Sequence, residues 1–179
     1  MGALNIGYAK QAGYEVIITA SPHNFNMVKG LGADHVYDRS GSDVIEQVSQ
    51  HLPIKYWFDT ISLRDSVEKV VALAVKQREL ESDHIQILLL LPPAMSSLPP
   101  FPEGITSQMM LFQIKAPENK DHMEWLLGKD GYMERGLKGG WLRGVPAEII
   151  SGLGAVQQGV QDIVAGVSAK KLIIEPWVE

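Results

Sequence analysis

Residues 2–38 read GALNIGYAKQAGYEVIITASPHNFNMVKGLGADHVYD, and this stretch decides the fold class. Its first ten residues place apolar side chains four positions apart, which is typical of one face of a helix. The run YEVIITA at 14–20 predicts a strand, and HVYD at 35–38 predicts another after a short helix. The continuous apolar character of IITA indicates a strand that is covered on both faces of a parallel sheet.

The same alternation continues along the chain. Strands are predicted at 55–60 and 84–91, and amphipathic helices at 44–52 and 63–79. Strands that alternate with helices of this length favour crossover connections and a parallel sheet. The sequence therefore predicts an α/β fold, a doubly wound, Rossmann-like parallel sheet.

Proline interrupts this pattern at 91–104, where five prolines occur in fourteen residues. Because proline is excluded from helix interiors and central strands, this stretch predicts an extended connector. We divide the chain into a dinucleotide-binding region at 1–92, a connector with an edge strand that completes the sheet at 93–118, and a C-terminal part at 119–179. The expected elements after the connector are an edge strand at 109–114, helices at 118–127 and 153–167, a glycine-rich turn region at 128–144 and a closing strand at 171–175.

Composition excludes several classes of function. A net charge of -5 argues against nucleic-acid binding, which needs clustered Lys and Arg. The absence of Cys excludes disulfides, iron–sulfur clusters and Cys-based zinc sites within these residues. The five histidines have no short ligand spacing, so we expect no metal site. No apolar run is long enough to cross a membrane and no secretory signal is recognisable, so we expect a cytoplasmic protein without membrane contact.

The beginning of the chain allows two interpretations. A doubly wound sheet usually starts with a strand and a glycine-rich loop before its first helix, and no GxGxxG motif is present here. Either Gly2 is the last glycine of such a loop, or the fold starts with a helix.

Several motifs, in this order, resemble the medium-chain dehydrogenase/reductase superfamily. They are GALNIGYAKQAGY, TASPHNF, KGLGAD and VYD in the first forty residues, then YWFDTIS, ILLLLP and GLGAVQQGVQDIVAGVSAKKLIIEP. The chain is most similar to the zinc-independent trans-enoyl reductases and their quinone-reductase-like relatives. In that family a separate catalytic domain, the first strand and its glycine-rich loop precede these motifs. The resemblance thus implies a truncated form that lacks all three and ends in a C-terminal segment of the catalytic lobe.

Ser21, His23 and Asn24 follow the strand at 14–20, where an acidic residue would select NAD through the ribose 2′-hydroxyl. No acid is present, so these side chains can donate hydrogen bonds to a 2′-phosphate. The resemblance places the 2′-phosphate of NADPH here too, with Tyr37 near the adenine. Many relatives carry Lys at the position of His23. The alternative interpretation is a turn that caps the next helix.

Two more turns at the same edge of the sheet are candidates. The resemblance places cofactor contacts at Ile61 and Ser62, and main-chain contacts at Leu90 and Leu91. It also implies that Lys171, in the motif SAKKL, reaches the cofactor; the alternative is that this lysine only interacts with a helix dipole. Asp59 is expected to be partly buried, with capping of the next helix as its alternative role. No catalytic residue is identified.

The resemblance implies an NADPH-dependent oxidoreductase lineage that reduces an α,β-unsaturated acyl or enone substrate. The substrate is a small molecule or is bound to an acyl carrier, with a polyketide synthase as a possible partner. The alternative is a non-catalytic nucleotide-binding or docking module. Because the absent first strand would be central, exposed strand edges predict that the isolated chain self-associates.

Overall fold

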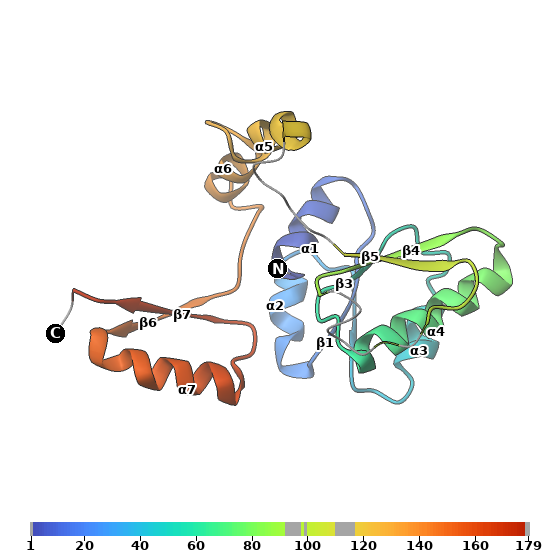
Figure 1. Ribbon diagram of the computed structural model, residues 1–179, viewed down its shortest axis with the longest axis horizontal. Helices are drawn as coiled ribbons and strands as arrows, with labels where there is room; N and C mark the ends of the chain where they lie inside the picture. Colours follow the sequence, from blue (N-terminus) through green and yellow to red (C-terminus); the bar gives the residue numbers. More distant parts are fainter. Residues whose placement is uncertain (1, 92–97, 99, 110–116, 178–179) are drawn as a thin grey trace.

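A computed structural model describes residues 2–91, 98, 100–109 and 117–177 (Figure 1). Its first part alternates helices and strands as the sequence predicts. The elements in chain order are α1 (Gly2–Gln11), β1 (Ile17–Ala20), α2 (Phe25–Gly30), β2 (His35–Asp38), α3 (Val44–Ser49), β3 (Trp57–Asp59), α4 (Arg64–Leu80), β4 (Ile85–Leu89) and β5 (Ile105–Met109).

All strand pairs of this region are parallel. β1 pairs with β2, with Thr19 opposite Tyr37, and β3, β4 and β5 form a three-stranded sheet in that order. β5 is an edge strand of this three-stranded sheet, and it shares only Met109 with the edge strand expected at 109–114, which stays a prediction. Most of the predicted range, residues 110–114, lies outside the described residues.

The sheet is divided between β1 and β3, which share no ladder. The chain builds β1 and then β2 outward on one side, and β3, β4 and β5 outward on the other. This is the order of a doubly wound fold in which a central strand between β1 and β3 is not contributed by the described residues. The Tyr14 and Tyr56 rings, just before β1 and β3, meet edge to face with centroids 5.1 Å apart.

Two apolar clusters hold these strands and helices together. The larger one joins β3, β4 and β5 to α3 and α4, and Ala74, Ile87 and Leu89 are fully buried in it. The helix predicted at 63–79 is confirmed as amphipathic, since Val67 and Ala74 of α4 are buried in this cluster. The smaller cluster joins α1 and α2 to the β1–β2 pair. Its buried members are Ile6, Val16, Val28 and Ala33.

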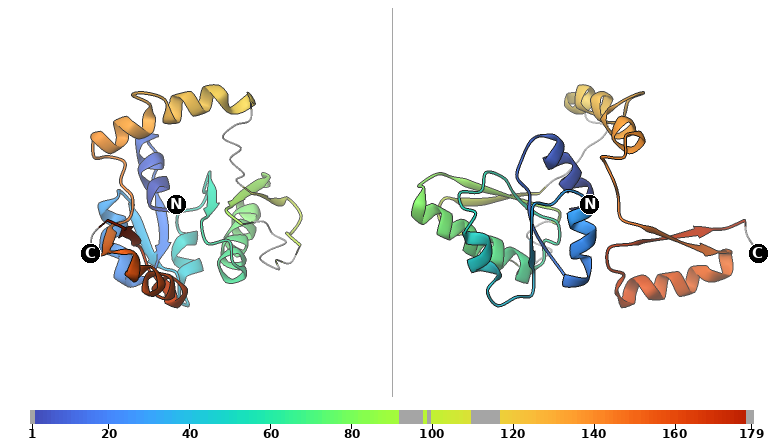
Figure 2. Two further views of the ribbon diagram at one scale, coloured as in Figure 1. Left: turned by 60° about the vertical axis from the view of Figure 1, so that its left-hand side comes forward. Right: turned by 180° about the vertical axis from the view of Figure 1, so that it is seen from behind.

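The C-terminal part has two pieces. α5 (Lys120–Leu127) and α6 (Tyr132–Lys138) lie at one end of the molecule. A separate β–α–β unit follows, made of β6 (Ala147–Ser151), α7 (Val156–Gly166) and β7 (Lys171–Glu175), with β6 and β7 parallel (Figure 2). The predicted closing strand at 171–175 is confirmed.

Two C-terminal predictions need correction. The stretch 128–144 is not only a glycine-rich turn region, because it contains α6, and β6 was not foreseen at all. The helix α6 was missed because tertiary packing, and not a turn, requires a glycine in this stretch. A Cβ on Gly136 would lie 2.7 Å from the Leu142 Cβ, so this glycine is where the returning chain packs against the helix. From local composition alone, a glycine in this position predicts a turn.

α6 and the chain after it cover the outer face of α1. Leu142 is 1% exposed, and a Cβ on Gly7 of α1 would lie 3.2 Å from its Cδ1 atom. The Tyr8 and Tyr132 rings stack with centroids 4.8 Å apart. Burial raises the pKa of the Tyr8 hydroxyl, and the neighbouring Tyr132 adds to this effect.

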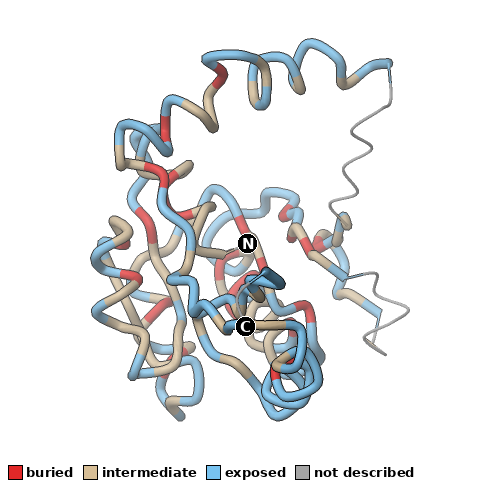
Figure 3. The backbone as a smooth tube through the Cα atoms, turned by 90° about the vertical axis from the view of Figure 1, so that its left-hand side faces the viewer, coloured by how far each residue is buried: buried red, intermediate tan, exposed pale blue. Residues whose placement is uncertain are grey.

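Burial is uneven over the molecule, as Figure 3 shows. Buried positions concentrate in the β1–β5 region, whereas residues of β6, α7 and β7 are mainly exposed. In the described ranges, no helix has the length and apolar character needed to span a bilayer.

Candidate functional site

The division between β1 and β3 also marks the topological switch point, where ligands of open α/β sheets bind outside the carboxyl ends of the strands. Three elements meet there. β1 ends at Ala20, β3 ends at Asp59, and α1 begins beside Thr60, since a Cβ on Gly2 would lie 3.2 Å from the Thr60 Oγ1 atom. The first turn of α1 is thus placed at the carboxyl edge of β3. Free amides in such a first turn favour an anion.

The turn after β1 meets the distant turn before β7. The Ser168 Oγ atom lies 2.9 Å from His23 Nε2 and accepts a hydrogen bond from Asn24 Nδ2 at 3.0 Å. Ser21 occupies the N-cap position of a short 3₁₀ helix (Pro22–Asn24), yet its side chain makes no capping hydrogen bond. Capping therefore does not explain the hydroxyl of Ser21, which is left for another partner.

Lys171 is the residue of the SAKKL motif that the resemblance assigns to the cofactor. It is the first residue of β7, pairs in register with Ala147, and has an exposed side chain. Its neighbour Lys170 forms an ion pair with Glu148. Within the described part of the chain, it is Ser168 of this motif that reaches His23 and Asn24.

The turn after β3 is fastened to the turn after β4. Asp59 Oδ1 accepts hydrogen bonds from the amides of Ile61 at 2.8 Å and Ser62 at 3.0 Å. Ser62 Oγ donates to the Asp59 carbonyl at 3.0 Å and accepts from the Leu90 amide at 2.7 Å. Asp59 thus organises its own turn, while Ser62 holds the two carboxyl-end turns in one crevice.

The remaining predicted residues differ in accessibility. Ser62 is fully buried and Leu90 half-buried, whereas Ile61 and Leu91 are 39% and 37% exposed. Only the last two therefore offer exposed side chains to a ligand. Tyr37 lies in β2 and its hydroxyl is 2.6 Å from His51 Nε2, so this side chain belongs to a different cluster.

Ser168 was not predicted as a site residue, because in this motif only the positively charged Lys171 was considered as a partner of the cofactor. Ser168 stands in the same SAKKL motif as Lys171 and was visible there. Nothing in the sequence around this serine indicates that its side chain contacts residues 23 and 24, which are more than 140 positions away. Only the placement of the β6–α7–β7 unit beside α2 makes that contact.

Comparison with known proteins gives consistent relatives. No family model matches the chain. The protein named dehydrogenase azaJ from Aspergillus niger is 30% identical over 179 residues, covering 97% of this chain and 49% of that protein. The trans-enoyl reductase TwmE from Talaromyces wortmannii is 28% identical over 184 residues, covering 97% of this chain and 50% of that protein. The chain thus spans about half the length of the curated relatives it matches.

A solved structure gives the same picture of the fold. CurA from Vibrio vulnificus, solved in complex with NADPH, superimposes with a TM-score of 0.66 at 18% identity, over 98% of this chain and 53% of that chain. The parallel strands and their switch point define a Rossmann-like α/β fold. The relatives support the resemblance to the medium-chain dehydrogenase/reductase superfamily, and the solved structure supports its fold; the chain spans about half the length of each of these proteins.

Proposed function

We propose that this chain is the cofactor-binding part of an NADPH-dependent reductase that acts on an α,β-unsaturated acyl or enone substrate. The observation that carries this proposal is the group of donors that the fold assembles after β1. Relatives named dehydrogenase and trans-enoyl reductase support the reaction class. We also propose that the substrate is a small molecule or is bound to an acyl carrier, with a polyketide synthase as the partner in the second case.

The 2′-phosphate of NADPH is held after β1 in this proposal. The Ser21 hydroxyl makes no capping hydrogen bond within the described residues, and His23, Asn24 and Ser168 supply three more polar groups within one hydrogen-bonded cluster. None of these four residues is acidic, so no carboxylate among them repels a phosphate. A phosphate would replace the mutual contacts of His23, Asn24 and Ser168 with contacts to its own oxygens.

The turn after β3 fits the sugar of a dinucleotide. Asp59 Oδ2 is buried and has no hydrogen-bond partner in the described residues, so it lacks a donor. Leaving a buried carboxylate oxygen unsatisfied is costly, and a ribose hydroxyl would supply the missing donor. The first turn of α1, beside Thr60, is where a pyrophosphate would accept hydrogen bonds from backbone amides. Lys171, Tyr37, Ile61, Ser62, Leu90 and Leu91 stay predicted cofactor contacts.

The chemistry is divided between cofactor and protein. NADPH, when bound, supplies a hydride for the β-carbon of the substrate. The described residues bind and orient the cofactor: the cluster after β1 fixes its adenosine end, and the turn held by Ser62 fixes the opposite end. No side chain in the described ranges is assigned as the acid that protonates the α-carbon.

A second candidate is a nucleotide-binding or docking module without turnover. The divided sheet favours it for this chain taken alone, because β1 and β3 each carry an unpaired edge at the switch point. Cofactor affinity and orientation both depend on how firmly the two halves of the sheet are held together.

One experiment separates the two functions. The full 179-residue chain is titrated with NADPH and with NADH by fluorescence, and oxidation of NADPH is then followed with a short enoyl thioester. Binding of NADPH with turnover supports the reductase, and binding without turnover supports the module. Ser168→Ala should weaken NADPH binding about tenfold, whereas Ser82→Ala, an exposed serine in the loop before β4, should not. If neither nucleotide binds, the reductase and the nucleotide-binding module are both wrong, and only a docking module is left.

A further inference from the structure

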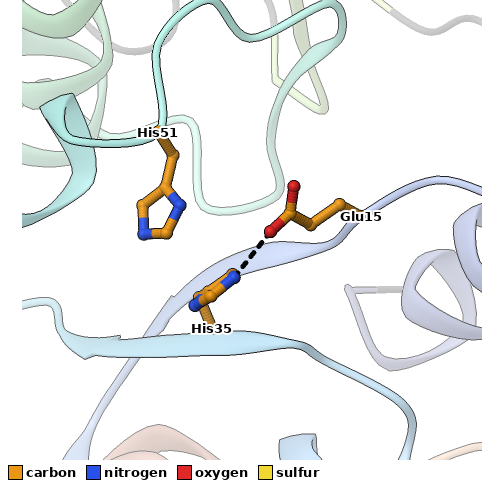
Figure 4. Close-up of side chains that lie close together, drawn as sticks. All are labelled: Glu15, His35 and His51. Carbon is orange, nitrogen blue, oxygen red and sulfur yellow. Dashed lines mark hydrogen bonds and ion pairs between the residues drawn. The ribbon is translucent and has the colours of Figure 1, made fainter.

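A second polar cluster lies at the opposite, amino-terminal edge of the sheet. Glu15 precedes β1, His35 is the first residue of β2, and His51 follows α3. Figure 4 shows the three side chains turned toward one another. One potential ligand atom from each residue lies within 4.8 Å of the others. The candidate cofactor crevice uses the carboxyl ends of β1 and β3, so this cluster is separate from it.

Two short contacts already order the cluster. His35 Nε2 lies 2.6 Å from Glu15 Oε1, and the His35 and His51 rings have centroids 4.1 Å apart. A carboxylate and two imidazoles in this proximity are a set of nitrogen and oxygen donors. We propose that Glu15, His35 and His51 form a binding site for a divalent transition-metal ion, with zinc as the ion that suits these donors best.

The geometry is close to what zinc requires. Two histidines and one carboxylate are an established zinc ligand set, with ligand bonds of about 2.0–2.2 Å. Ligand atoms around a tetrahedral zinc ion are therefore about 3.4 Å apart. A separation within 4.8 Å needs only small side-chain rotations to reach that value. The metal would take the place of the proton between His35 and Glu15.

Tyr37 supplies support from outside the ligand set. Its hydroxyl lies 2.6 Å from His51 Nε2. Metal-binding histidines usually donate their second ring N–H to a neighbouring acceptor, which fixes the tautomer and the ring orientation. With Nε2 donating to Tyr37, the Nδ1 atom of His51 presents its lone pair for coordination. Tyr37 thus acts as a positioning residue in this site.

The site would join the two halves of the divided sheet. Glu15 lies just before β1 and His35 begins β2, whereas His51 belongs to the connection that leads into β3. The Glu15 side chain is 64% exposed, so solvent can occupy a remaining coordination position. Because the ion would bind the folded arrangement and not the unfolded chain, it would stabilise the fold.

Calorimetric titration of the full chain with zinc chloride tests this site. We expect one saturable zinc per chain, and no comparable binding of magnesium, which prefers oxygen ligands. Glu15→Gln, His35→Gln and His51→Gln should each weaken zinc binding at least about tenfold. His84→Gln is the matched control, because His84 is an exposed histidine that bonds Thr106 instead, and it should change nothing.

Thermal melting provides a second measurement that does not depend on activity. Zinc at about a hundredfold excess over its dissociation constant should raise the melting temperature of the unaltered chain by roughly 5 °C. At the same zinc concentration the rise should fall to about half or less in His51→Gln. Glu15→Gln alters an exposed side chain and keeps the test decisive if a histidine variant does not fold. Zinc binding that is equal in all variants, or magnesium binding as tight as zinc, would overturn the proposal.

Discussion

At the residue scale, the crevice depends on one strained serine. Ser62 has φ 56°, a left-handed conformation that favours glycine, and its side chain is fully buried. Its hydroxyl bonds the Asp59 carbonyl and the Leu90 amide. These two hydrogen bonds offset the backbone cost and hold the turns after β3 and β4 together.

Substitution of Ser62 separates strain from hydrogen bonding. Ser62→Ala keeps the strain and removes the acceptor of the half-buried Leu90 amide, so we expect a loss of about 2 kcal/mol in the free energy of unfolding. Ser62→Gly loses the same bonds but relieves the backbone, and should cost about 1 kcal/mol less than Ser62→Ala. Urea denaturation of both variants measures this difference. Equal stability of the two variants would show that the strain is not significant.

Asp34 links α1 to β1, and its effect depends on pH. Hydrogen bonds from Lys10 Nζ and from the Val16 amide lower the pKa of its carboxyl group. A lowered folded-state pKa stabilises the fold above the unfolded-state value of about 3.9, and this contribution is lost as pH falls through the folded-state pKa.

Asp34→Asn should therefore cost about 1 kcal/mol at pH ~7, a modest value because the side chain is partly exposed. The difference from the unaltered chain should shrink below pH ~4. Urea denaturation across this range measures it, with the exposed Asp83→Asn as control. A difference that is constant with pH would contradict the assigned ion pair.

At the element scale, sequence periodicity predicted the elements that form the β1–β5 region. HVYD at 35–38 and the helix near 63–79 were recognised because apolar spacing sets both their formation and their packing. α6 was not, because Gly136 is required by the approach of Leu142 and not by a turn. β6 is mostly exposed and, among the described strands, pairs with β7 alone. Its sequence therefore lacks the alternating apolar pattern by which a strand is predicted. In the polar cluster proposed to bind the cofactor, the local residues Ser21 to Asn24 could be singled out from the sequence, whereas the contact with Ser168 could not.

Leu142 tests how α6 is held on α1. Its side chain is 1% exposed and contacts the Gly7 position of α1. Leu142→Ala should lower the free energy of unfolding by about 2–4 kcal/mol through lost burial and a residual cavity. Leu137→Ala, in α6 but 56% exposed, should cost far less. Chemical denaturation compares them. Similar losses for both would mean that α6 does not pack on α1 through Leu142.

At the scale of the whole molecule, apolar surface remains uncovered. Many of the exposed large apolar residues lie in or next to the β6–α7–β7 unit: Ile149, Leu153, Val156, Val160, Ile163, Val164, Ile173 and Trp177. Apolar surface of this kind usually marks an interface. Together with the unpaired edges of β1 and β3, it predicts association of the isolated chain.

Val164 is a suitable position at which to test association, since this apolar residue of α7 is 82% exposed. The unaltered chain should sediment as dimers or larger species at micromolar concentration. Val164→Glu should shift the distribution toward monomer, because a charge resists burial in an apolar interface. Gln157→Glu, on the same helix, adds the same charge at a polar position and should have little effect. A monomeric unaltered chain would contradict this prediction.

The ratio of NADH to NADPH dissociation constants tests the central claim, recognition of a 2′-phosphate after β1. We predict that the unaltered chain binds NADPH at least about tenfold more tightly, and that Asn24→Asp removes most of this preference because its carboxylate repels the phosphate. Gln86→Glu adds the same charge on β4 and should leave the ratio unchanged. Equal affinities for the two nucleotides, or a ratio that Asn24→Asp does not alter, would contradict the account.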